Sequence, residues 1–143
     1  MIRWLFFITF AILIALSFVE LARIQLVWNE SPSEPVGVWH PTHEPLRRGV
    51  YVEFYMPLKR IVAMAGDRVT FAAEGITVNG NPIIPKTAPE PKILQHCPFG
   101  TYTVPPNMIV AIGDHPDSWD ARYLCWLPES LVFSTMQPVW VTR

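Results

Sequence analysis

The chain has 143 residues, 50% of them hydrophobic and only 16% charged, and its mean hydropathy is +0.24. Soluble domains carry about 25% charged residues, so this composition favours a protein attached to a membrane. Fifteen prolines exclude a helical bundle, because proline removes a helix hydrogen-bond donor, and a formal net charge of −1 argues against nucleic acid as a partner.

The first predicted element is an apolar helix at the N-terminus. Residues 4–19 carry no charge, and as a helix they extend about 24 Å, slightly less than a hydrocarbon core of roughly 30 Å. Arg3 precedes this run, so the positive-inside tendency places the N-terminus in the cytoplasm. A cleaved signal peptide and a buried core helix are the alternatives. We predict a single-pass membrane anchor over residues 1–27, with residues 28–143 outside the cytoplasm.

The rest of the chain is predicted to be a small, mostly β domain. Proline and histidine are frequent in residues 28–49, and prolines interrupt residues 85–100, so both stretches are predicted as loops. Asn79-Gly80 predicts a hairpin turn. Runs of β-branched and aromatic residues predict strands at residues 50–55, 60–64, 68–71, 76–78, 81–84, 102–104, 108–112, 131–133 and 139–141.

A proline-rich stretch directly after the apolar helix is the first candidate for chemistry. Residues 31–37 read Ser-Pro-Ser-Glu-Pro-Val-Gly. The two prolines stiffen the backbone around Ser33, and Gly37 permits a turn that a larger residue would hinder. A nucleophilic serine needs such a fixed, exposed position. A juxtamembrane linker without catalytic function is the alternative.

Lys59 is the second candidate, because its neighbours in the sequence are methionine, leucine, isoleucine and valine, with Arg60 as the adjacent charge. Strand alternation places Lys59 and Arg60 on opposite faces. Burial and nearby positive charge both lower the pKa of a lysine, which makes it a usable general base near neutral pH. The alternative is an edge-strand lysine with its ammonium group in water.

The third candidate is residues 113–123, Gly-Asp-His-Pro-Asp-Ser-Trp-Asp-Ala-Arg-Tyr. Its carboxylates occur at every third position and lack the ligand spacing of an EF-hand, so no metal site is predicted. A polar network is favoured, with Asp120 pairing with Arg122 and Ser118 donating a hydrogen bond. The four histidines are scattered and are interpreted as solvated, so a serine–lysine pair, which needs no histidine, is the favoured catalytic arrangement.

Taken together and in this order, these stretches resemble the S26 signal peptidases, which are membrane-anchored serine proteases with a Ser–Lys dyad. Ser33 after an apolar segment matches the serine box of that family, and residues 59–67 resemble its lysine box, KRIVGLPGD. Residues 76–80 resemble its V-x-V-N-G hairpin, and residues 113–122 resemble its GDNRDNSxDSR box. The resemblance implies a signal-peptidase-like β domain on an N-terminal transmembrane helix, with no cofactor.

One branch of the family is the most similar. Residues 29–39 read N-x-S-x-S-x-P-x-G-x-W, where general leader peptidases have S-M-x-P-T. This form, with its shorter last box, is similar to the TraF branch of conjugal-transfer maturation peptidases. The similarity implies processing of a pilin precursor, with cyclisation of the product in some relatives. It also implies a periplasmic catalytic domain on the bacterial inner membrane, with type IV secretion components as partners.

The resemblance also implies roles for individual residues. Ser33 is expected to be the nucleophile, and Lys59 the base that deprotonates it and then protonates the leaving amine. The Ser31 hydroxyl is expected to join the Ser33 backbone N–H in the oxyanion hole. The last box is expected to supply the residue that orients the Lys59 ammonium and the two that brace the site: Ser118, Asp120 and Arg122.

Cys97 and Cys125 are the only cysteines. Outside the cytoplasm they can form a disulfide, and closing a loop of this length stabilises a fold by about 3–4 kcal/mol on the chain-entropy model. Two buried free thiols are the alternative.

Two other functions compete with pilin maturation. The first is a general leader peptidase that removes signal peptides from exported preproteins. The second is a catalytically silent adaptor in pilus assembly, against which the presence of both Ser33 and Lys59 argues.

Overall fold

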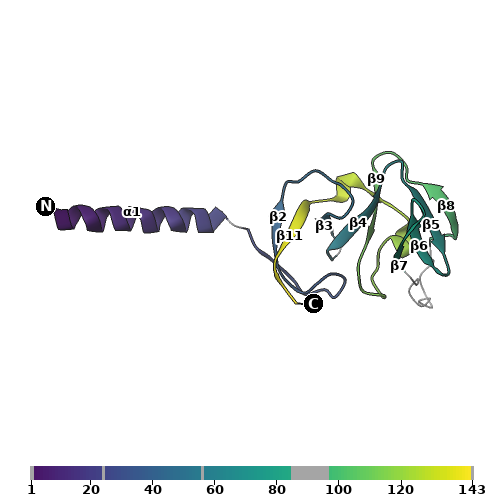
Figure 1. Ribbon diagram of the computed structural model, residues 1–143, viewed down its shortest axis with the longest axis horizontal. Coiled ribbons are helices and arrows are strands. Elements are labelled where there is room, and N and C mark those ends of the chain that lie inside the picture. The colour runs from purple at the N-terminus through teal and green to yellow at the C-terminus, as the bar shows by residue number, and fades with distance from the viewer. Residues whose placement is uncertain (1, 24, 56, 85–96, 143) are drawn as a thin grey trace.

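The computed structural model describes residues 2–23, 25–55, 57–84 and 97–142. An N-terminal helix, α1 (Ile2–Arg23), stands apart from a domain that contains two antiparallel sheets (Figure 1). The prediction of a mostly β domain after an N-terminal helix is therefore confirmed.

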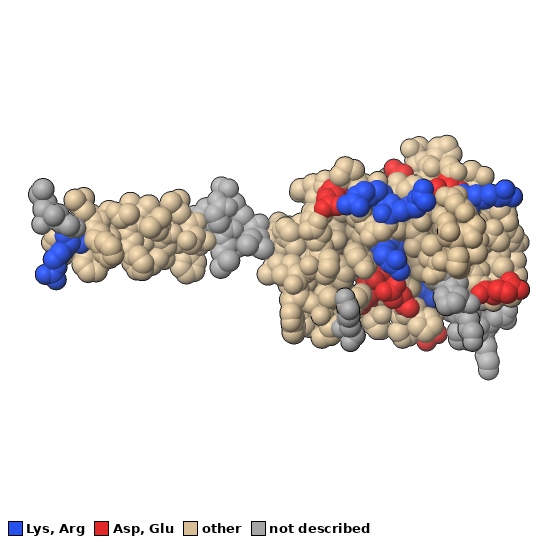
Figure 2. Space-filling view, viewed as in Figure 1, with Lys and Arg blue, Asp and Glu red and all other residues tan. Residues whose placement is uncertain are grey.

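The side chains of α1 described at residues 3–18 are all exposed, and most of them are apolar. On the described part of this helix, Figure 2 shows basic colour at the N-terminal end, whereas the β domain carries acidic and basic groups together. The predicted helix is present, but its predicted membrane crossing is not confirmed: among the described residues, no helix is both long enough and apolar enough to span a membrane.

The strands form a large and a small sheet. In spatial order, the large sheet contains β1 (Val27–Asn29), β2 (Gly37–Thr42), β11 (Ser134–Val141), β3 (Tyr51–Glu53), β4 (Lys59–Met64), β9 (Met108–Ile112) and β10 (Leu127–Pro128). The small sheet contains, likewise in order, β7 (Asn81–Ile84), β6 (Gly75–Val78), β5 (Arg68–Ala72) and β8 (Gly100–Thr103). The turn between β6 and β7 has positive φ at Asn79 (52°) and Gly80 (82°), as the Asn-Gly pair predicts.

Strands β4 and β9 lie at the centre of the domain, because hydrophobic clusters cover both of their faces. Val110 and Ile112 of β9 pack into one cluster with the small sheet, whereas Ile109 and Ala111 pack into another with Ile61 of β4. A register shift between Ile61 and Ala63 interrupts the predicted alternation along β4. Lys59 begins this strand, which pairs with β3 and β9, so the edge-strand alternative for Lys59 is wrong.

The segment 28–49 was predicted as a loop, and this prediction is wrong in part. It contains the end of β1 and all of β2, which pair with each other, and β2 pairs further with β11. Trp39 of β2 is fully buried beside Met136 of β11. Burial of this tryptophan and pairing with a strand about a hundred residues later outweigh the local loop preference of the prolines.

The C-terminal part of the chain also differs from the prediction. The predicted strand 131–133 is replaced by a 3-10 turn, η1 (Glu129–Leu131), and β11 begins only at Ser134, extending the strand predicted at 139–141. A short helix, α2 (Ala121–Leu124), and the short strand β10 were not predicted. The predicted loop 85–100 falls largely outside the described residues.

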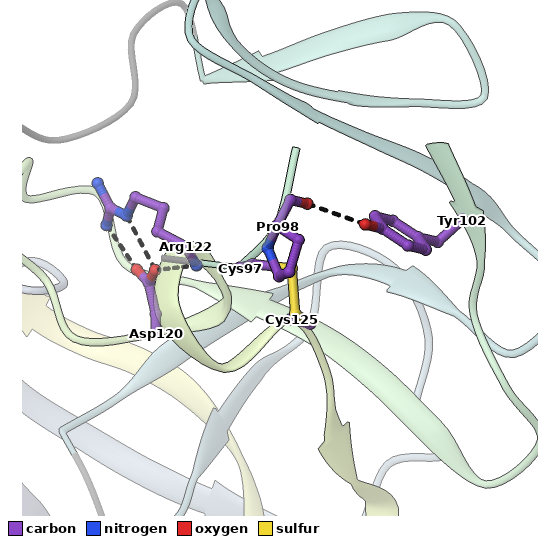
Figure 3. The surroundings of a disulfide bond; sticks show 6 residues. All are labelled: Cys97, Pro98, Tyr102, Asp120, Arg122 and Cys125. Atoms are coloured by element: carbon purple, nitrogen blue, oxygen red, sulfur yellow. Dashed lines mark hydrogen bonds and ion pairs between the residues drawn. A yellow bond between two sulfur atoms is a disulfide. The ribbon is translucent and has the colours of Figure 1, made fainter. Parts of the chain in front are cut away.

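Cys97 and Cys125 form a disulfide with an S–S distance of 2.11 Å (Figure 3). The backbone N–H of Cys97 donates to the carbonyl of Arg122 over 2.9 Å, and Cys125 is the C-terminal cap of α2. The covalent link therefore ties α2 to the chain that leads into β8.

We expect the double variant Cys97→Ala/Cys125→Ala to lose about 3–4 kcal/mol of stability, because its unfolded chain is no longer cross-linked. Thermal unfolding of the full chain, followed by circular dichroism, should show a Tm lower by about 10 °C. A reductant should lower the Tm of the wild type in the same way and leave the double variant unchanged. Equal Tm values for both proteins would contradict this prediction.

Candidate active site

Ser33 lies on the loop between β1 and β2, and the side chain of Asn29 holds this loop together. Its Nδ2 donates to the carbonyls of Ser31 (3.0 Å), Glu34 (3.1 Å) and Pro35 (3.1 Å), while its Oδ1 accepts from the N–H of Ser31 (3.2 Å). No role was expected for Asn29 from the sequence, although its place at the start of the N-x-S-x-S pattern was the available signal.

Ser33 is held from three directions and is only 7% exposed. Ser118 Oγ donates to Ser33 Oγ over 3.1 Å, and the N–H of Asp114 donates to the carbonyl of Ser33 over 2.5 Å. The Ser33 N–H donates to Ser31 Oγ over 3.2 Å. The expected position of Ser33 is therefore fixed, but it is buried rather than exposed in this state.

Ser31 was expected to share an oxyanion hole with the backbone N–H of Ser33. The structure brings these two groups together, but the N–H is directed at Ser31 Oγ itself. An oxyanion that accepts from both donors must replace this internal hydrogen bond.

Gly113 permits the close approach of the two serines. A Cβ at this position would lie 2.4 Å from Ser118 Oγ and 2.8 Å from the carbonyl oxygen of Ser33, both too short for a real contact. Gly113 begins the last sequence box, and sequence analysis gave it no role. In the sequence, the signals for this role were only that the residue is a glycine and that it begins the box. The lack of space around Gly113 arises from contacts between segments that are far apart in the sequence.

Lys59 is 1% exposed, and its Nζ donates to the carbonyls of Pro57 and Leu58 over 3.3 Å each. Burial lowers the pKa of Lys59, and Arg122 lowers it further, whereas the negative charges of Asp120 and Glu34 raise it. Its burial agrees with the apolar neighbourhood seen in the sequence.

Among the described residues, no hydrogen bond joins Ser118 to Lys59, although the family resemblance implies that Ser118 orients the ammonium. Its hydroxyl donates to Ser33 Oγ instead, and Lys59 Nζ donates to main-chain carbonyls. The absence of a Cβ on Gly113 leaves room for Ser118 beside the serine loop. Among the described residues, no hydrogen bond joins Lys59 to Ser33 directly.

Asp120 and Arg122 form a buried ion pair, shown in Figure 3, with Nη2–Oδ2 and Nε–Oδ1 distances of 2.5 and 2.8 Å. Asp120 Oδ2 also accepts from the N–H of Gly113 over 2.9 Å. The guanidinium donates to the carbonyls of Gly113, His115 and Pro116. This network, predicted as a pairing of Asp120 with Arg122, fixes the loop that carries Ser118.

Removing the charge of Asp120 should destabilise the domain, because the buried guanidinium of Arg122 is then left without its counter-ion. The expected loss in the free energy of unfolding is about 3–5 kcal/mol. We expect Asp120→Asn to lower the Tm by 10 °C or more, by roughly the usual relation of stability to Tm. The matched control is Asp117→Asn on the exposed part of the same loop. Equal Tm values for the two variants, measured by scanning calorimetry, would contradict the prediction.

Glu34, which follows Ser33, was not identified from the sequence as a site residue. It is 1% exposed, and neither carboxyl oxygen has a hydrogen-bond partner among the described residues. Burial, and to a smaller extent Asp114, raise the pKa of Glu34 from its ordinary 4.5 to about 8, against the opposing effect of Arg60 and Lys59. Glu34 is therefore mostly protonated at neutral pH.

This raised pKa makes stability depend on pH. The folded state binds the Glu34 proton more tightly than the unfolded state, so its contribution is lost as the pH rises from 4.5 to about 8. Glu34→Gln removes this dependence, and its stability relative to the wild type should rise by about 4 kcal/mol between pH 5 and pH 9, because each pKa unit corresponds to about 1.4 kcal/mol.

Chemical denaturation at several pH values measures this difference. Glu30→Gln is the matched control, because Glu30 is exposed on the same loop. A constant difference between Glu34→Gln and the wild type across this pH range would disprove the raised pKa.

The sequence profile of a family described as "Signal peptidase, peptidase S26" matches residues 1–141. The chain belongs to the S26 signal peptidase family. Within the described residues, no group of histidine, cysteine and carboxylate side chains is arranged to bind a metal ion.

Two relatives of this S26 family member are transfer proteins. The conjugal transfer protein TraF of Agrobacterium fabrum is 27% identical, over 78% of this chain and 80% of its own. A plasmid transfer protein TraF of Escherichia coli is 25% identical, with the same coverage. Among solved structures, a signal peptidase I of Enterococcus faecalis aligns with a TM-score of 0.47 and 19% identity, over 66% of this chain and 98% of that one.

Proposed function

We propose that this S26 family protein is a serine endopeptidase that matures a pilin precursor for conjugative transfer, with Ser33 as nucleophile and Lys59 as general base. One observation carries the proposal: Ser118 holds Ser33 through a hydrogen bond, and Lys59 is buried away from solvent. The similarity to proteins named TraF supports the conjugative role.

The hydrogen bonds around Ser33 and Lys59 suit this chemistry. Ser118 donates to Ser33 Oγ, so the Ser33 hydroxyl hydrogen is free to go to another acceptor. A neutral Lys59 amine can keep donating to the carbonyls of Pro57 and Leu58 while its lone pair accepts a proton.

In the proposed reaction, Lys59 takes the Ser33 proton as Ser33 Oγ bonds to the scissile carbonyl carbon. The peptide C–N bond then breaks, and the proton on Lys59 passes to the leaving amine. Water hydrolyses the resulting acyl-enzyme, or the precursor's own N-terminal amine displaces Ser33 and closes a cyclic product.

The oxyanion of this reaction is proposed to accept from the Ser33 N–H and the Ser31 hydroxyl, which lie within hydrogen-bond distance of each other. Exchanging that internal bond for bonds to the oxyanion adds stabilisation only as the negative charge develops.

We further propose a periplasmic location at the bacterial inner membrane. The disulfide suits an oxidising compartment. The apolar side chains of α1, exposed along its described length, suit a lipid surface better than water. Type IV secretion components that receive the mature pilin are the expected partners there.

The proposal is tested by co-expressing the full chain with its pilin precursor and following the precursor by mass spectrometry. We expect Ser33→Ala and Lys59→Ala to abolish processing, and Ser31→Ala to slow it about 100-fold or more, as for the loss of an oxyanion donor. Ser130→Ala, at an exposed serine, is the control and should process normally.

The outcomes separate the competing functions. Processing by both dyad variants would remove Ser33 and Lys59 from the chemistry and favour the adaptor. Cleavage of general preproteins without cleavage of pilin would favour a leader peptidase. A product lighter by one further water would identify cyclisation.

A further inference from the structure

We propose that Asn29 is a positioning residue, whose carboxamide fixes the direction in which Ser31 presents its hydroxyl to the oxyanion. This inference rests on the proposed function, because it gives Asn29 a part in that reaction through Ser31. Asn29 is the last residue of β1, lies opposite Gly37 of β2 and is only 7% exposed. Its side chain is therefore part of the interior that supports the serine loop.

The first support is that Asn29 binds both peptide groups that flank the Cα of Ser31. Its Oδ1 accepts from the Ser31 N–H over 3.2 Å, and its Nδ2 donates to the Ser31 carbonyl over 3.0 Å. The orientations of these two peptide groups set the φ and ψ angles of a residue, and hence the direction of its Cα–Cβ bond. One buried carboxamide thus determines where the Ser31 side chain begins.

The second support is that the carboxamide is itself held from the other side of Ser33. Its Nδ2 donates to the carbonyls of Glu34 and Pro35 over 3.1 Å each. The Pro35 carbonyl also accepts from Nε1 of the fully buried Trp39 over 3.1 Å. The core of the domain therefore fixes the carboxamide, and the carboxamide fixes Ser31.

The chemistry of the loop suits an asparagine at this position. Pro32 and Pro35 lack a backbone N–H, so the loop has fewer main-chain donors for its own carbonyls. A carboxamide offers two N–H donors and one acceptor on a planar group, and at least one of its N–H groups here is shared between carbonyls. Aspartate at position 29 has the same shape but no N–H donor, and its negative charge would face three carbonyl oxygens.

Ser33 has its own supports, which do not involve Asn29. Its Oγ accepts from Ser118 and its carbonyl from the N–H of Asp114. Loss of the carboxamide should therefore release Ser31 and leave the nucleophile in place. Among the described residues, Ser31 Oγ accepts from the Ser33 N–H and donates to no other group, so its hydrogen is available to an oxyanion.

The kinetics of pilin-precursor processing by the full chain in detergent test this role. Asn29→Ala and Asn29→Asp should each lower kcat by up to about 100-fold, the loss expected for an oxyanion donor. KM should change little, because the interaction acts in the transition state. Asn81→Asp is the matched control, since Asn81 is exposed. An unchanged kcat in both Asn29 variants would overturn the proposal.

A double-mutant cycle separates positioning of Ser31 from a general effect on the fold. In the Ser31→Ala background, Asn29→Ala should lower kcat by less than about threefold, because both substitutions remove the same donor. A role of Asn29 in folding alone would lower kcat by the same factor with and without Ser31. That equality would overturn the proposal.

Hydrogen exchange in the wild type keeps the proposal testable if the Asn29 variants do not fold. Nitrogen-15 NMR of the full chain in detergent should show the Asn29 carboxamide protons exchanging with water about tenfold or more slowly than those of Asn81, because they are buried and hydrogen-bonded. Equal exchange rates would overturn the proposal. If the wild type cleaves no precursor, the proposed function fails, whereas the exchange rates still decide whether Asn29 holds Ser31.

Discussion

The buried ion pair between Asp120 and Arg122 is the interaction on which the site depends. Its carboxylate caps α2 and accepts from Gly113, while its guanidinium binds carbonyls along the loop between them. The disulfide adds a covalent link at the other end of α2. The loop that carries Ser118 is thus fixed at both ends, and this rigidity allows one serine hydroxyl to be aimed at another from a distant segment.

The ionisable side chains of this site differ in whether they form ion pairs. Asp120 and Arg122 form a buried ion pair, and Asp114 and Arg60 form a more exposed one. Glu34 and Lys59 are buried, and within the described part of the chain neither forms an ion pair through a hydrogen bond. Burial of such groups costs stability, and it lowers the pKa of Lys59, as a general base near neutral pH requires.

Local patterns predicted much of this fold. The strands β7 and β9 have the predicted bounds, and the Asn79-Gly80 turn forms as expected, because alternation and turn chemistry act between near neighbours. The strand β2 and the short helix α2 were missed. The first depends on burial of Trp39 beside β11, and the second on capping by a buried Asp120, and neither effect is visible in a local window.

The sequence by itself determined the composition of the site: the serine and lysine boxes, the Asp120–Arg122 pairing and the family to which these belong. These follow from residue type and order along the chain. Only the tertiary structure decided which groups meet. Gly113 leaves room for Ser118 to meet Ser33, and the carboxyl group of Glu34 is buried. Such contacts join segments far apart in sequence, and their energies depend on burial, which the order of residues does not specify.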